Sequence, residues 1–147
     1  MELLIVVAII GILSAVGIVG FGGLLGGAKD AAATENHNRM ASFMETILTQ
    51  CSTKPTGSVP MGSGTYACAT SITSADTVFA NYLNTEFKSP MDTSRGMISG
   101  TTSTTPASGY STLYGSGTSL YLRTAVPNPD NPSVAKQVLI KTIRRDY

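Results

Sequence analysis

Apolar side chains fill the start of the chain without interruption. Residues 3–28 carry no charged group, and their apolar side chains are not confined to one side of a helical turn. A helix over this range would be about 39 Å long, enough to cross a bilayer with some tilt. A helix that is apolar all round needs lipid or other protein around it. The pattern therefore predicts a hydrophobic helix over residues 1–28.

After Ala28 the pattern becomes one-sided. The apolar positions recur at intervals of three and four residues, the spacing of a single buried helical stripe; they are Met40, Phe43, Met44, Ile47, Leu48 and Cys51. We expect one helix from near Glu2 to about Cys51. Its second part, residues 29–51, is predicted to be amphipathic and to pack on a globular head formed by residues 52–147.

The head has its own hydrophobic patterns. Apolar and aromatic residues between Ala75 and Phe87 indicate a short helix or an irregular aromatic layer, ended by Pro90. Residues 89–119 are rich in Ser and Thr, which is typical of a long loop or weak strands. Alternating residues in 118–126 and 134–143 indicate two strands. The predicted fold class is α+β, a long N-terminal helix with a small antiparallel sheet packed on its C-terminal half.

Composition and motif content argue against several classes of function. The net charge is +1 and only 13% of residues are charged, which argues against nucleic acid as a partner of the subunit itself. Nucleophile-elbow, phosphate-loop and paired-carboxylate patterns are absent from the sequence, so we expect no enzyme activity and no cofactor. The only histidine, His37, lies between Asn36 and Asn38, and we expect it to be solvated or to contact another subunit. Two cysteines with one histidine are too few for a zinc site, so no metal is expected.

The two cysteines enclose a turn-rich segment. Cys51 and Cys68 flank residues that include several Gly and Pro. A disulfide closing a loop of this size contributes about 3 kcal/mol in the chain-entropy model. We predict a Cys51–Cys68 disulfide and an oxidising compartment. Arg144 and Arg145, close to the last residue, are expected to be solvated or to contact a neighbouring head weakly.

Glu2 is the residue that the apolar pattern explains least. A carboxylate costs on the order of 2.5–3.5 kcal/mol at the centre of a bilayer and less near an interface, so an ordinary anchor does not carry one there. Glu2 followed by the apolar string Leu3–Ala15 resembles the N-terminal signature of type IV pilins and pseudopilins. In that family a prepilin peptidase removes a short leader, and the new N-terminal residue is methylated. The alignment puts Glu2 on the family's fifth mature residue, which implies that three mature residues and a leader precede Met1.

The resemblance implies an assembly. The chain would be the structural subunit of an extracellular type IV pilus, a helical homo-oligomer that supports adhesion, motility or DNA uptake. Subunits would reside in the inner membrane before the pilus assembly machinery adds them to the filament. Glu2 would attract the N-terminal ammonium of a neighbour and set subunit register. The residues expected to pack in the filament core are Leu3, Leu4, Ile5, Val6, Val7, Ile9, Ile10, Ile12 and Leu13.

Two other functions remain open. The chain could be a pseudopilin that acts as a short piston in a type II secretion system. Alternatively, the helix could be a plain anchor and the head a membrane-tethered binding domain. Purified appendages built mainly of this chain would favour the pilus, whereas a monomer retained in the membrane would favour the alternatives.

Glycines mark the end of the apolar segment. Many pilins have a proline where this chain has Val19, and here glycines surround that position instead: Gly17, Gly20, Gly22, Gly23, Gly26 and Gly27. Each costs a helix interior roughly 0.8–1 kcal/mol relative to Ala, which predicts a weakened or non-helical segment within Gly17–Gly27. The pairs Gly22/Gly26 and Gly23/Gly27 equally suit close packing between membrane helices. Both interpretations stay open at the level of sequence.

Overall fold

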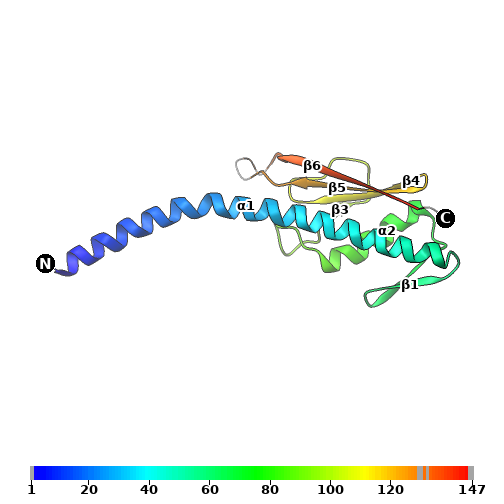
Figure 1. Ribbon diagram of the computed structural model, residues 1–147. Helices are drawn as coiled ribbons and strands as arrows, with labels where there is room; N and C mark the ends of the chain where they lie inside the picture. Colours follow the sequence, from blue (N-terminus) through cyan, green and yellow to red (C-terminus); the bar gives the residue numbers. More distant parts are fainter. Residues whose placement is uncertain (1, 129–130, 132, 146–147) are drawn as a thin grey trace.

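The longest element of the structure is the N-terminal helix, on which the rest of the chain packs. The computed structural model describes residues 2–128, 131 and 133–145, without the side chains of residues 2 and 19–22. Helix α1 (Glu2–Thr53) has 52 residues, a length of about 78 Å. Its first half projects alone from one end of the molecule, while its second half lies against the head (Figure 1). The predicted α+β arrangement of a long N-terminal helix and a small sheet is confirmed.

The head consists of two sheets and one further helix. A hairpin, β1 (Ser58–Met61) and β2 (Gly64–Ala67), precedes helix α2 (Ile72–Glu86). The larger sheet contains β3 (Ile98–Gly100), β4 (Ser111–Ser116), β5 (Ser119–Val126) and β6 (Gln137–Arg144). Its strand order is β3-β4-β5-β6, so β3 and β6 form opposite edges. The pairs β4–β5 and β5–β6 are antiparallel, whereas β3 and β4 are parallel.

Both helices cover one face of the larger sheet. Helix α1 contacts β5 and β6, and α2 contacts β4 and β3. Alternate residues of the central strands point into the core: Leu113 of β4 is paired with Leu122 of β5, and both are fully buried. The predicted stripe of α1 meets them, since Met40 and Met44 are also fully buried. The larger sheet thus packs against the amphipathic half of α1.

Several predicted elements need correction. The turn-rich segment between the cysteines forms the hairpin β1–β2, which was not predicted from the sequence, and its turn uses Gly62 with a φ of +58°. The Ser/Thr-rich range contains β3 and β4, and the β3–β4 pair makes the sheet mixed rather than wholly antiparallel. Gly115 explains why β4 can lie against the start of α2, because a Cβ there would be 2.2 Å from the Ile72 carbonyl oxygen.

Helix α1 continues through the glycine-rich segment. The backbone is helical at every position of Gly17–Gly27, and the helix ends at Thr53, close to the predicted end at about Cys51. The non-helical form therefore does not occur in the isolated subunit, while a weakened helix and close packing both stay predictions. Helix formation is cooperative, and a segment flanked by helix on both sides needs no new nucleus, so it tolerates poor helix formers. Whether this segment loosens inside a filament stays a prediction.

Candidate functional site: the projecting half of α1 and its junction with the head

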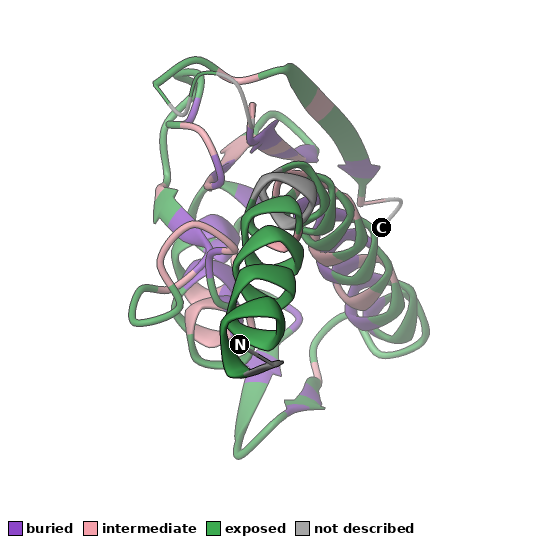
Figure 2. Ribbon diagram, turned by 90° about the vertical axis from the view of Figure 1, so that its left-hand side faces the viewer, coloured by how far each residue is buried: buried purple, intermediate pink, exposed green. Residues whose placement is uncertain are grey.

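The projecting half of α1 exposes its apolar side chains on every side. Each of the large residues expected in a filament core lies on this surface, with 52–77% of its area accessible. They are Leu3, Leu4, Ile5, Val6, Val7, Ile9, Ile10, Ile12 and Leu13. Viewed from the N-terminal end, this half is exposed all round, whereas buried residues appear only farther along the helix (Figure 2). Glu2 begins α1, and its side chain lies outside the described part.

Glycines leave open space along this half. A Cβ at Gly11, Gly17, Gly23 or Gly27 would meet no atom within 4 Å apart from the adjoining helix backbone. Gly20, Gly22 and Gly26 are likewise in helical conformation. Contacts within the subunit therefore do not require a glycine at position 11, 17, 23 or 27. Their role, if it is close packing, concerns a partner outside the chain.

The same half has the properties of a membrane span. α1 is long and apolar enough to cross a bilayer, and its most apolar window has no residue buried within the subunit. A soluble core helix of this length would be covered by its own fold. The helix can therefore serve as a membrane anchor on grounds of length and composition.

Ion pairs link the second half of α1 to β6 and to Lys136, the residue just before β6. Lys136 Nζ lies 2.9 Å from Asp30 Oδ2, and Lys141 Nζ lies 2.9 Å from Glu45 Oε1. The first pair sits where α1 leaves the head, beside an open groove of about 620 Å³ between Gly27–Glu35 and the ends of β5 and β6. Asp30 is the more buried partner, with 16% of its side chain accessible. Both pairs link α1 to the C-terminal part of the head, and their contribution is modest because at least one partner of each is exposed.

A buried polar cluster joins α1 to the sheet between these two ion pairs. His37 Nδ1 lies 2.8 Å from Thr124 Oγ1, which lies 2.6 Å from Ser111 Oγ. His37 is only 5% exposed, so the expectation that it is solvated was wrong. Burial, and secondarily the positive charge of Lys141, lower the pKa of His37. Desolvation disfavours the charged imidazolium, so the native head holds the neutral ring.

The sequence did contain a signal for this burial. His37 precedes Met40 by three residues and follows Ala33 by four, and both of these residues are fully buried. His37 therefore continues the apolar stripe of α1 toward the N-terminus. The neighbouring asparagines concealed this continuity because they flank His37 in sequence but lie on other sides of the helix.

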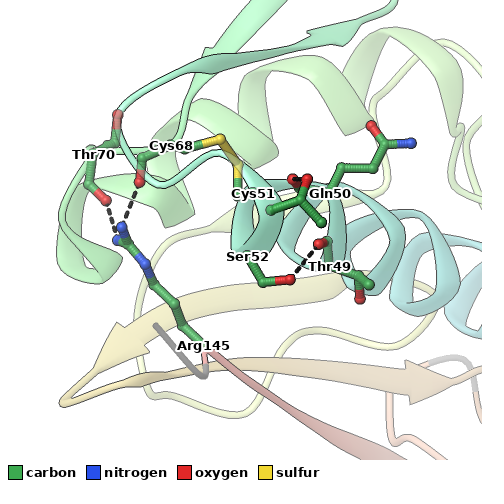
Figure 3. The surroundings of a disulfide bond; sticks show 8 residues. Thr49, Gln50, Cys51, Ser52, Cys68, Thr70 and Arg145 are labelled. Atoms are coloured by element: carbon green, nitrogen blue, oxygen red, sulfur yellow. Dashed lines mark hydrogen bonds between the residues drawn. A yellow bond between two sulfur atoms is a disulfide. The ribbon is translucent and has the colours of Figure 1, made fainter.

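The predicted disulfide forms at the far end of α1. Cys51 and Cys68 are bonded, with Cα atoms 5.3 Å apart, and both are fully buried. The bond joins the end of α1 to the end of the β1–β2 hairpin. Figure 3 shows Arg145 reaching the same corner from the C-terminal strand, where its guanidinium donates hydrogen bonds to the carbonyl oxygens of Thr70, at 2.5 Å, and Cys68.

Arg145 corrects a second expectation. It is partly buried rather than solvated, while Arg144 is exposed as expected. Because the guanidinium donates to two carbonyls in a fixed fork, it positions the last strand against the disulfide-bonded loop. The C-terminal segment is thus held by an arginine rather than by a disulfide of its own. The sequence offered no spacing signal for this contact, since the partners are about 75 residues apart.

The described residues contain no group of three His, Cys, Asp or Glu side chains that could hold a metal ion. Comparison of the chain with protein-family models, with characterised proteins and with solved structures gave no match. The most distinctive surface of the molecule is the projecting apolar half of α1.

Proposed function

We propose that this chain is the structural subunit of an extracellular filament of the type IV pilus kind, polymerising through residues 3–25 of α1. One observation carries the proposal: a head with its own buried core bears a long helix whose described large apolar side chains, from Leu3 to Leu25, all stay exposed. Contiguous exposed apolar surface of this size needs a lipid or protein environment.

A membrane meets that need only while the subunit stays in it. The polar, disulfide-bonded head suits an oxidising extracytoplasmic space, and the helix suits the bilayer before assembly. In a filament, the same helix would be covered by copies of itself, which exclude water as completely as lipid does. The projection of α1 in line with the head's long direction allows parallel copies to pack helix to helix.

Glu2 supports assembly over simple anchoring. A carboxylate at the start of an apolar helix is costly in lipid. Its cost falls when an opposite charge is held beside it, and in pilins the N-terminal ammonium of a neighbour is that charge. The desolvation penalty offsets much of the attraction, so the contribution is chiefly to the register between subunits.

The direct test replaces Glu2 in the native host and measures surface filaments and membrane-bound subunit separately. Glu2→Gln and Glu2→Ala are expected to lower filament yield at least about tenfold, since one lost charge contact of 1.4 kcal/mol per added subunit already has this effect. The amount of subunit in the membrane is expected to stay unchanged. Imaging of native fibres would identify the subunit from side-chain density.

Glu35→Gln is the matched control. Glu35 is an exposed carboxylate on the same helix, paired with Arg39 at 2.6 Å, and exposed pairs contribute under about 1 kcal/mol. The filament yield of the Glu35→Gln variant should equal that of the unsubstituted chain. Filaments at normal yield in the Glu2 variants would contradict the proposed register role. A chain that never leaves the membrane, or that forms only short periplasmic assemblies, would favour an anchored binding domain or a pseudopilin instead.

A further inference from the structure

The two flanks of the head differ in a way that suits contact between copies. The sheet order places β6 at one edge and β3 at the other. α1 packs under the β6 side and α2 under the β3 side. One flank is thus built from β6, and the opposite flank from α2 and β3. A subunit with two unlike flanks can bind the next subunit in one direction only.

The β6 flank is an open strand edge. In the described sheet, β6 pairs with β5 alone. The backbone N–H of Arg145 donates to the carbonyl oxygen of Thr118. In an antiparallel pair, residues whose backbone groups face the partner strand alternate with residues whose groups face away. The backbone N–H and C=O groups that face away from β5 therefore belong to Val138, Ile140, Thr142 and Arg144. Val138 and Ile140 are also exposed, Ile140 by 59%. Long open edges with apolar side chains promote association unless they are covered.

The opposite flank is a groove lined by hydrogen-bonding side chains. It holds about 300 Å³ between α2 and β3, and its lining includes Thr77, Asn81, Asn84, Ser99 and Thr101. The Asn84 amide already completes the backbone pairing of Ile98, accepting from its N–H at 2.7 Å and donating to its carbonyl at 3.1 Å. Side chains of this groove therefore satisfy strand backbone within the subunit, and the remaining amide and hydroxyl groups can do so for a second strand.

Charge also differs between the flanks. Residues 136–145 contain four cations and no carboxylate: Lys136, Lys141, Arg144 and Arg145. Of the two carboxylates of α2, Asp76 is buried and accepts from the backbone N–H of Gly115, so Glu86 is the exposed one. Lys88, just after α2, donates to the carbonyl oxygen of Asn84 beside the groove. Lys136 and Lys141 are paired with Asp30 and Glu45, so the exposed Arg144 is the cation that a second β6 edge would meet. Repulsion between two copies of Arg144 disfavours contact between two β6 edges and leaves contact between unlike flanks as the better choice.

We propose that β6 of one copy docks into the α2–β3 groove of a second copy, forming the contact between heads in the assembled filament. The proposal rests on the proposed function, because that function makes the α1 helices of neighbouring copies parallel. Copies related by rotation about, and translation along, a common axis meet through unlike surfaces, and such a contact extends into a filament.

The test cross-links native filaments through one engineered thiol on each flank. The chain's two native cysteines are joined to each other, so Ile140→Cys and Asn81→Cys would supply the only free thiols. Both positions are exposed. A short bis-maleimide applied to filaments of the double variant should give a ladder of dimers, trimers and higher multimers, and either single variant should stay monomeric. Ile140→Cys paired with Ser116→Cys, at the β4–β5 turn, is the matched control and should give no ladder.

The outcomes separate the two proposals. Dimers from Ile140→Cys alone would mean that two β6 edges meet, and filaments without a ladder would mean that the flanks do not meet; either result overturns this inference and leaves the proposed function standing. Absence of filaments from the unsubstituted chain overturns the proposed function itself.

If the double cysteine variant makes no filaments, the filament yield of Ile140→Glu tests the docking of β6 instead, with Ser116→Glu as the control variant. The inference expects filament yield to fall at least about tenfold with the membrane pool unchanged, whereas filaments at normal yield would overturn it.

Discussion

The two halves of α1 belong to one continuous helix but have opposite environments. In the first half every described large apolar side chain is exposed, and in the second half Met40, Met44 and Cys51 are fully buried. The backbone does not distinguish them, since the helix is unbroken from Glu2 to Thr53. The difference lies in what covers each half: the head covers the second, whereas the described large apolar side chains of the first stay exposed. Stability of the head and assembly are therefore separable properties of the same helix.

The largest effect is expected from a charge in the first half. Leu13→Asp places a carboxylate amid exposed apolar residues, at a cost of roughly 2.5–3.5 kcal/mol within lipid and more between packed helices. Filaments should be lost, and the head should keep its disulfide and its resistance to protease. Filament counts by electron microscopy and limited proteolysis measure the two properties. Thr46→Asp, an exposed position in the second half, is the control; equal loss from both would remove the distinction between the halves.

A cavity in the second half of α1 should destabilise the head, unlike a substitution in the first half. Met44→Ala removes a fully buried side chain and should lower the free energy of unfolding of the head by about 2–5 kcal/mol. Ile10→Ala, in the first half, should leave that free energy unchanged. Denaturant unfolding of the full chain in detergent, followed by tyrosine fluorescence, provides the measurement. A comparable destabilisation by Ile10→Ala would show that the projecting half contributes to the head.

Removal of the disulfide should destabilise the head at the C-terminal end of α1. Cys51→Ser together with Cys68→Ser should lower the free energy of unfolding by about 3 kcal/mol, because the loop of the unfolded chain is no longer constrained. The Arg145 contacts would remain available to hold the β1–β2 hairpin. The measurement is the same denaturant experiment, compared with the oxidised and reduced unsubstituted chain. No difference between oxidised and reduced chain would refute the stabilising role.

The smallest expected effect is a pH dependence from His37. Its pKa is lowered in the folded head, so the unfolded chain binds the proton first, below the free imidazole value of about 6.5. The free energy of unfolding should then be constant above this pH and fall as pH drops from about 6.5 toward 5, by up to about 1.4 kcal/mol per pH unit. His37→Asn should remove this slope between pH 7 and 5, where carboxylates remain charged. A slope that persists in His37→Asn would assign it to another group.

Much of this molecule could be predicted from local pattern. The apolar run, the stripe of the second half, α2, the two C-terminal strands and the disulfide all follow from spacing and residue type along one element. Burial of His37, the role of Arg145 and the parallel β3–β4 pair did not. Each of these depends on a partner from a distant segment, and periodicity within one element carries no information about that partner.

The sequence by itself determined that one helix would be apolar all round at its start and one-sided afterwards, because side-chain hydrophobicity at helical spacing is a local property. Only the tertiary structure decided which surfaces stay uncovered: the projecting half of α1, the open edge of β6 and the groove beside β3. Exposure is a property of the packed whole, since a side chain is buried only when another element lies over it.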